Sequence, residues 1–220
     1  MINDAPIAMI DTETTNDIDC PIVYDVGYQI FSPVTGEILC ERSFLNADVF
    51  CDHELMASAY FAEKIPQYWE DVKNHKRTLM SWYMIKKTFA NDCKEYGVKI
   101  ACAHNACFDN RALNNTQRYI TTSKYRYFLP YDIEWWDTLK MARATLKNDN
   151  DYGEFCYNND YLTSRGCRRY TAEIIYRYIT NENDFEESHT GLEDVKIERT
   201  IFEYLLSLDP SIDGKLWRDE

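Results

Sequence analysis

The sequence predicts an α/β domain in which a mixed sheet is covered by helices on both faces. Apolar, β-branched and aromatic segments of strand length fill residues 7–45 and are separated by turn residues, which is typical of an antiparallel meander. From about residue 53 helical patterns alternate with short apolar segments, which favours further, parallel strands. The 220 residues are 45% hydrophobic and 15% aromatic, without a repeat or low-complexity linker, so we expect one domain over residues 1–220.

The predicted meander has three strands. Residues 7–15 form an apolar run that ends in polar side chains, and residues 24–31 alternate between aromatic or β-branched residues and polar ones. A turn follows at residues 32–36, which contain Pro and Gly, and residues 37–45 continue as the third strand.

The remaining elements follow in chain order. We expect a short helix over residues 54–61 and a longer one over residues 79–96 that ends at Gly97, a left-handed cap. Residues 98–103 form a compact apolar strand, and Asn105 is the predicted N-cap of a helix that runs to about residue 120.

The C-terminal half repeats this alternation of strand and helix. The pattern predicts a strand over residues 133–138 and a helix through Met141 and Ala144. The segment 148–159 is dense in Asn, Asp and Gly and predicts a loop, and helices are expected over residues 171–179 and 192–208.

Two carboxylates stand one residue apart at the end of the first strand. Because strand side chains alternate between faces, Asp11 and Glu13 emerge on the same side and repel each other. A divalent metal ion with oxygen ligands would relieve this repulsion. The alternative is a polar strand end that runs into a turn, so the pair needs partners elsewhere in the chain.

Composition limits the function classes. A net charge of −13 argues against a protein that coats nucleic acid along its length, whereas an acidic pocket for one strand end is compatible with it. The start of the sequence lacks a leader pattern, and no apolar run approaches the roughly 18 residues of a membrane span, so we expect a cytoplasmic protein without a membrane partner. The eight cysteines are scattered and are expected to be reduced, and Cys102, His104 and Cys107 lack the further ligands of a zinc site.

Further acids follow in a fixed order along the chain. Asp109 lies near the start of the helix after residues 98–103, and Asp194 opens the last helix with His189 five positions before it. Together with the first pair, these residues resemble the DEDDh superfamily of 3′-to-5′ exonucleases, in particular the group of the epsilon proofreading subunit and ribonuclease T. The resemblance spans residues 7–206 and implies a ribonuclease H-like fold.

The motifs that carry the resemblance are short. They are Asp11-Thr12-Glu13-Thr14-Thr15, His104-Asn105-Ala106-Cys107-Phe108-Asp109 and His189-Thr190-Gly191-Leu192-Glu193-Asp194, with Asp137-Thr138-Leu139 followed by Ala142-Arg143 as a minor motif. Three positions depart from the family pattern. Asn16 stands where the family usually has Gly, and Gly191 and Val195 stand where small alanines are common.

The resemblance implies two Mg²⁺ ions, for which Mn²⁺ would substitute, because carboxylate ligands and phosphate oxygens favour these ions over zinc. Asp11 would bridge both ions, Glu13 and Asp194 would complete one site, and Asp109 would support the other. His189 would act as general base, and His104 would be structural.

Several residues are candidates for contacts with the nucleic acid. Thr14 and Thr15 would meet the terminal nucleotide, and Phe108 would either stack on a base or pack in the core. A basic stretch that contains Arg165, Arg168 and Arg169 would guide the phosphate backbone or would be a solvated face. A weaker, scattered set comprises Arg111, Arg118, Lys124 and Arg126.

The predicted function is a metal-dependent 3′-to-5′ exonuclease that releases nucleoside 5′-monophosphates, with a single-stranded DNA end as the favoured substrate. One alternative is an exoribonuclease that trims RNA or clears oligonucleotides, because the motifs do not encode contacts with the 2′-hydroxyl. Another is a catalytically silent docking module on the same fold. A replication or repair partner would dock on the domain surface, and the sequence leaves open whether the protein acts alone or as a homodimer.

Overall fold

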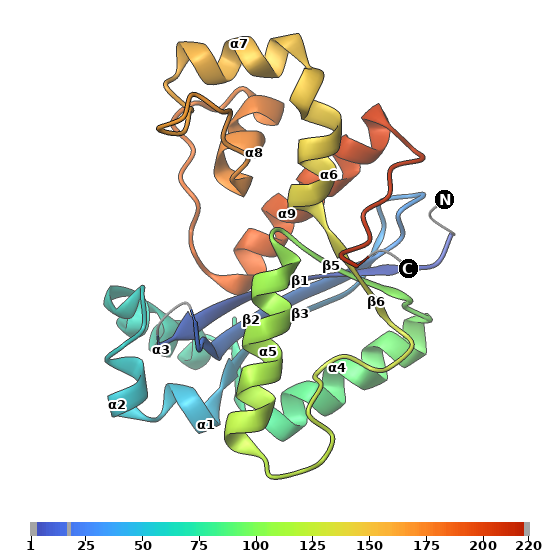
Figure 1. The fold of residues 1–220 in the computed structure, drawn as a ribbon. Coiled ribbons are helices and arrows are strands. Elements are labelled where there is room, and N and C mark those ends of the chain that lie inside the picture. The colour runs from blue at the N-terminus through green and yellow to red at the C-terminus, as the bar shows by residue number, and fades with distance from the viewer. Residues whose placement is uncertain (1–3, 17–18, 218–220) are drawn as a thin grey trace.

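A computed structural model describes residues 4–16 and 19–217 of the chain. In this part of the chain one six-stranded sheet has the order β4-β3-β2-β1-β5-β6 (Figure 1). Its strands are β1 (Ile7–Thr15), β2 (Ile22–Phe31), β3 (Ile38–Asn46), β4 (Thr78–Met80), β5 (Ile100–Ala103) and β6 (Glu134–Asp137).

The sheet is mixed, as the sequence predicts. β1, β2 and β3 form the antiparallel meander, whereas β5 pairs with β1, β6 pairs with β5 and β4 pairs with β3 in parallel. Ile7 to Ile10 of β1 are fully buried, which suits an apolar strand in the middle of a sheet that is covered on both faces. Since β1 and β5 are parallel, the residues that follow their carboxyl ends meet at one edge of the sheet.

Helices cover both faces of the sheet. α4 (Trp82–Tyr96) and α5 (Ala106–Ile120) lie on one face (Figure 1). The opposite face carries α6 (Thr138–Thr145), α8 (Ala172–Thr180) and α9 (Gly191–Leu208), with α7 (Asn150–Asn158) beyond them, and three short helices lie at one end of the sheet, α1 (Ala47–Phe50), α2 (His53–Met56) and α3 (Ile65–Lys73).

Each face has its own apolar core. On the α4 and α5 side, the fully buried Tyr28 and Phe89 rings meet edge to face at 5.0 Å, and the Tyr28 hydroxyl donates to Asp92. On the α9 side, Phe31 and Phe202 meet in the same way at 5.8 Å. Truncating a buried phenylalanine such as Phe202 to alanine typically costs about 3–5 kcal/mol, so the Phe31–Phe202 contact contributes strongly to the docking of α9.

The first turn of α9 lies in direct backbone contact with β2. A methyl group added at Gly27 would lie 2.2 Å from the backbone of Gly191, so neither glycine leaves room for a side chain. The amide of Gly191 donates to the buried carboxylate of Asp25, which also binds the Arg77 guanidinium at 2.9 Å. Arg77 is itself 3% exposed at its side chain and reaches Glu193 of α9. This contact fixes where α9 begins relative to the sheet.

One predicted loop is a helix. Residues 148–159 contain α7, because the Asp149 side chain accepts a hydrogen bond from the Tyr152 amide and caps the helix. Tyr152 and Cys156, four residues apart, are buried on one face of α7. The loop prediction is therefore wrong, because a segment of polar composition forms a short amphipathic helix.

The region between β3 and α4 also differs from the prediction. The helix expected over residues 54–61 is shorter, and the prediction omitted α1, α3 and the three-residue strand β4. The helix expected from residue 79 begins at Trp82, because residues 78–80 pair with β3. The predicted left-handed cap at Gly97 is confirmed by its φ of 73°.

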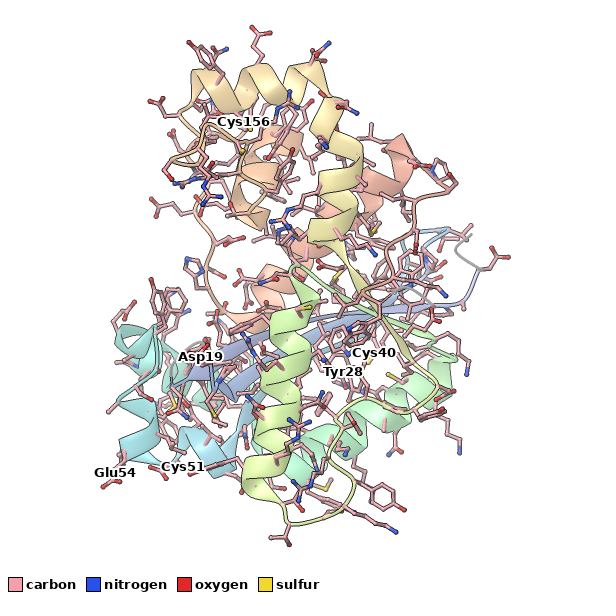
Figure 2. All side chains as sticks on the ribbon, in the orientation of Figure 1. Asp19, Tyr28, Cys40, Cys51, Glu54 and Cys156 are labelled. Atoms are coloured by element: carbon pink, nitrogen blue, oxygen red, sulfur yellow. The ribbon has the colours of Figure 1, made fainter. Side chains whose placement is uncertain are left out.

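The cysteines are spread over the molecule. Figure 2 places Cys40 near the sheet, Cys51 among the short helices and Cys156 in the outer helical layer. Cys40, Cys93, Cys102 and Cys156 are buried, which is ordinary for small apolar side chains. Among the described helices, none is both long enough and apolar enough to cross a bilayer.

Candidate active site

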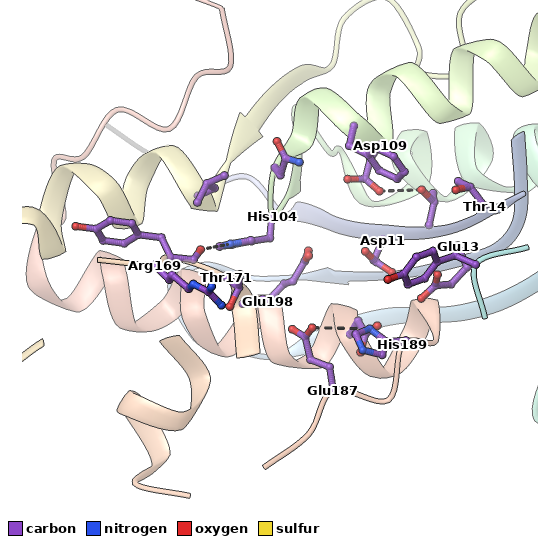
Figure 3. Close-up of a pocket in the computed structure, with 18 of the residues that line it drawn as sticks. Asp11, Glu13, Thr14, His104, Asp109, Arg169, Thr171, Glu187, His189 and Glu198 are labelled. Atoms are coloured by element: carbon purple, nitrogen blue, oxygen red, sulfur yellow. Dashed lines mark hydrogen bonds and ion pairs between the residues drawn. The ribbon is translucent and has the colours of Figure 1, made fainter. Parts of the chain in front are cut away.

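The four predicted acids and His189 line one pocket of about 820 Å³. The pocket lies where the end of β1, the start of α5 and the start of α9 come together, and Figure 3 shows Asp11, Glu13, Asp109 and His189 facing it. Residues up to 183 positions apart in the sequence thus share one site, as the ordered motifs predict.

The end of β1 supplies the first pair. Asp11 pairs with Gly27 and Glu13 pairs with Asp25, so the two acids share the strand face on which α9 packs. The register shifts between Glu13 and Thr14, and Asn16 then adopts a left-handed backbone with a φ of 65°. Asparagine tolerates this conformation better than most other non-glycine residues.

Asp109 reaches the pocket from the first turn of α5. Its Oδ1 accepts a hydrogen bond of 2.8 Å from the Thr12 hydroxyl on the opposite strand face from Asp11. The turn before α5 contains Asn105, whose φ is 69° and whose amide donates to Asp137. Asn105 is therefore the N-cap, as predicted, although its side chain makes no capping hydrogen bond.

Asp194 and His189 come from the start of α9 and the loop before it. Ligand atoms of Glu13, His189 and Asp194 all lie within 4.8 Å of one another, which is close enough for one ion to contact all three. The amide of Thr190 donates to Asp194 at 3.0 Å and holds this carboxylate at the helix start.

The His189 ring is fixed by a segment that the sequence did not point to. Phe61 stacks on it with ring centroids 4.3 Å apart and an interplanar angle of 12°. Lys64 donates from its Nζ to the carbonyl of Ser188 and so ties the loop to the short helices. Glu187 Oε2 lies 3.9 Å from His189 Nδ1 (Figure 3).

The pocket is strongly unfavourable for negative charge. Burial, followed by the neighbouring carboxylates, raises the pKa of Glu13 to about 9 and that of Asp11 well above its ordinary value. Burial also raises the pKa of both Asp109 and Asp194 to about 7. The pKa of His189 is lowered by burial and then by Lys64, which keeps the imidazole neutral near pH 7.

A fifth buried carboxylate faces the same pocket. Glu198 lies four residues after Asp194 on α9, is 4% exposed and appears between His104 and Asp11 in Figure 3. Of the acids near Asp11, Glu198 makes the largest contribution to its raised pKa after burial. The four-residue spacing from Asp194 would have identified it, since such residues share a helix face.

The predicted substrate contacts divide into two groups. Thr14, Phe108, Arg168 and Arg169 line the pocket. Of these, Arg168 also braces its own loop, because its Nη1 donates to the carbonyls of Leu146 and Asp149.

The other two predicted contacts are not among the pocket-lining residues. Thr15 is fully buried and its hydroxyl donates to the Ile22 carbonyl, so this hydroxyl is turned away from the pocket. Arg165 is exposed. Of the weaker set, Arg111 lies over the Phe108 ring with its guanidinium carbon 5.8 Å from the centroid.

His104 also lines the pocket, and both of its ring nitrogens have partners. Its ring nitrogens lie 2.9 Å from the Thr138 hydroxyl and 2.7 Å from the Tyr170 carbonyl, and burial lowers its pKa. It joins the end of β5 to the segment that precedes α8.

The donor set of the pocket fits a hard divalent ion. Apart from the imidazoles of His104 and His189 it offers carboxylate oxygens, and no cysteine is among the described lining residues. Mg²⁺ and Mn²⁺ prefer such oxygen ligands, and the crowded acids are stabilised when a cation lies between them.

Comparison with solved structures identifies the fold. The nuclease domain of 3′hExo, a DEDDh family member bound to rAMP, matches with a TM-score of 0.64 and 11% identity over 97% of each chain. The fold is that of the DEDDh exonucleases. Other structures with this DEDDh fold include Exonuclease X in complex with 5′ overhanging duplex DNA, with a TM-score of 0.50 and 15% identity over 94% of each chain.

E. coli Exonuclease I in complex with a dA16 oligonucleotide also shares the DEDDh fold, with a TM-score of 0.54 and 12% identity over 94% of this chain and 41% of that one. No protein-family model and no curated protein sequence matches this chain. At these identities the similarity establishes the fold, and the chemistry has to be argued from the residues of the pocket.

Proposed function

We propose that the protein is a metal-dependent 3′-to-5′ exonuclease that hydrolyses the terminal phosphodiester bond of a nucleic acid and releases a nucleoside 5′-monophosphate. The observation that carries this proposal is the convergence of Asp11, Glu13, Asp109, Asp194 and His189 on one pocket of a DEDDh fold. Each motif is short and common, whereas their meeting at one edge of the sheet is specific.

The carboxylates would hold two Mg²⁺ ions. Glu13 and Asp194 would bind one ion together with Asp11, and Asp11 would share the second with Asp109. When bound, such ions lower the pKa of water and offset the charge that develops on the attacking and leaving oxygens. The hydrogen bond from Thr12 keeps the Asp109 carboxylate oriented toward the pocket.

His189 would accept the proton of the attacking water. Its lowered pKa leaves the ring neutral near pH 7, so a nitrogen is available as a base. The stacked Phe61 ring and the Lys64 contact to Ser188 restrict the orientations of the imidazole. Positioning of this kind increases the rate because the base does not have to be ordered during the reaction.

The pocket suits one strand end better than a continuous duplex. The chain carries a net charge of −13, so an extended phosphate backbone gains little general attraction. Phe108 and Thr14 line the pocket near the acids and would contact the terminal nucleotide, and Arg168 and Arg169 would neutralise a phosphate further from the end. A single-stranded DNA end is the substrate we favour.

The decisive assay is degradation of matched 5′-labelled DNA and RNA oligomers with and without Mg²⁺. We expect a ladder that shortens from the 3′ end only when Mg²⁺ is present, and the RNA arm tests the exoribonuclease alternative. Wild-type protein that degrades neither oligomer with Mg²⁺ or Mn²⁺ would refute the proposal and favour a silent docking module.

Two variants separate the roles of the residues. Asp11→Asn removes a ligand and should abolish both hydrolysis and tight metal binding in calorimetric titration. His189→Ala should reduce hydrolysis by about two to four orders of magnitude while ions still bind, because general-base catalysis contributes about that much. Equal metal affinity in the wild type and in Asp11→Asn would contradict the assignment of the ligands.

A further inference from the structure

We propose that Glu198 is a fifth carboxylate ligand of the metal site, beyond the four acids that the motifs supply. It would bind the ion that Asp11 shares with Asp109, from the side of the pocket that faces His104. The inference rests on the proposed metal dependence, and it assigns a role to a residue that the sequence motifs do not include.

The position of Glu198 brings its carboxylate to the other acids. Residues four apart on a helix lie on the same face one turn apart, so Glu198 extends from α9 beside Asp194. It lines the pocket, and Figure 3 shows its side chain directed toward the space between His104 and Asp11.

The partners of Glu198 leave one oxygen without a hydrogen bond. The backbone amide of His104 binds the carboxyl group, whereas Oε2 is fully buried and has no hydrogen-bond partner in the described part of the chain. A buried polar group without a partner destabilises the fold, and more so when it is charged. The fold therefore keeps an unfavourable group in a side chain that is 4% exposed.

The surroundings of that oxygen select the kind of ligand. Burial, followed by the charges of Asp109 and Asp194, raises the pKa of Glu198, so acids lie close to its carboxyl group. No ion pair of the described residues includes Glu198. A phosphate would be repelled by this group of carboxylates, whereas a divalent cation would bind the free oxygen and relieve the repulsion.

A fifth ligand has a measurable consequence. The affinity of a carboxylate site for a divalent ion increases with the number of charged ligands. With Glu198, the site that includes Asp11 and Asp109 gains a direct ligand and should bind its ion more tightly than a site of two carboxylates would.

Calorimetric titration with Mn²⁺ and Mg²⁺ tests the inference on the full chain. We expect Glu198→Gln to weaken the binding of one ion at least about tenfold. Glu198→Asp keeps the charge but withdraws the oxygens by one methylene group, and it should weaken binding to an intermediate degree. Glu187→Gln is the matched control, because it removes one negative charge from the same pocket at a residue that we do not assign as a ligand, and it should change the affinity less than about threefold.

The outcomes distinguish this inference from the proposed function. Unchanged ion affinity in Glu198→Gln, or an equal loss in Glu187→Gln, would overturn the role of Glu198 while the wild type still binds two ions and degrades DNA. A wild type that binds neither Mn²⁺ nor Mg²⁺ would overturn the proposed function as well. Because Glu198→Gln removes a buried acid, its melting temperature in EDTA should equal or exceed that of the wild type, which verifies that the variant is folded.

Discussion

The backbone contact between β2 and α9 predicts that Gly27→Ala damages the active site although Gly27 is not among the residues that line the pocket. The added methyl carbon would lie 2.2 Å from both Gly191 C and Leu192 N, whereas ordinary contact begins at 3.4 Å. These are backbone atoms of a helix start, so a rotamer change cannot relieve the overlap. The start of α9 must therefore move away from β2 by about 1 Å.

The displacement has two calculable effects. Overpacking of this kind costs about 1–3 kcal/mol, which lowers the melting temperature by about 3–10 °C in a chain of this size. Asp194 moves with α9 whereas Glu13 stays on the sheet, so their ligand atoms, which lie within 4.8 Å of each other, separate. Because a misplacement of about 1 Å reduces catalysis about 100-fold, we expect that loss in the hydrolysis rate.

The assay is single-turnover hydrolysis of a 5′-labelled oligomer at saturating Mg²⁺, with the folded fraction measured by circular dichroism. Gly97→Ala is the control, because its φ of 73° imposes strain while no atom lies within 4 Å of the added carbon. It should lose stability and keep its rate. A Gly27→Ala protein that hydrolyses DNA at the wild-type rate would refute the view that this contact positions the site.

Two further predictions concern the charge and the geometry of the pocket. Burial raises the pKa of Asp109 and Asp194 from 3.8 to about 7, so the folded apo protein binds more protons than the unfolded chain between about pH 4 and 7. Its melting temperature in EDTA should therefore fall from pH 5 to pH 8, by an amount that reflects about 3 kcal/mol for Asp109, because about two pH units separate pH 5 from its pKa and each contributes about 1.4 kcal/mol. Mg²⁺ should restore the melting temperature, and a constant value would contradict this. Phe61→Ala should lower the hydrolysis rate about tenfold without changing Mg²⁺ affinity in calorimetry, because Phe61 supports the His189 ring and holds no ion. An unchanged rate would show that the stacking is incidental.

The sequence predicts the sheet well because its signals are local. Ile7 to Ile10 are an uninterrupted apolar run, and such a run before paired acids indicates a central strand whichever residues lie beside it. The same holds for α5 and α9, whose ends agree with the predictions within one residue or so. Motif spacing then places the acids at the carboxyl edge of the sheet.

The errors occur where a short element depends on tertiary contacts. α7 is rich in Asn and Asp, and its stability comes from burying Tyr152 and Cys156 rather than from its own helix propensity. β4 has three residues and exists because β3 offers an unpaired edge beside it. Neither contact is visible in the local pattern.

The structure gives a steric reason for the glycine at the start of α9. A side chain at Gly191 would meet the amide of Gly27 at 2.7 Å and the carbonyl of Asp11 at 3.2 Å. From the sequence alone, Gly191 is only a position at which the pattern of the resembled family commonly has alanine. The structure shows a direct backbone contact of helix and sheet, held by Asp25 and Arg77, which lie 166 and 114 residues from Gly191 along the chain.

The pocket contains more acids than cations. On the proposed function, this excess determines whether the metal ions or the strand end would bind first. Asp11, Glu13, Asp109, Asp194 and Glu198 line it, and the nearby Lys64 lowers the pKa of Glu13 and Asp194 too little to offset their burial. A phosphate that approached this pocket without metal ions would meet a group of buried carboxyls that outnumber the lining cations Arg143, Arg168 and Arg169. Two divalent ions reverse that balance, because they attract both the carboxylates and the phosphate oxygens. On the proposed function, the ions would bind before or together with the strand end, and the same buried acids that make the apo protein less stable would make nucleic-acid binding dependent on metal.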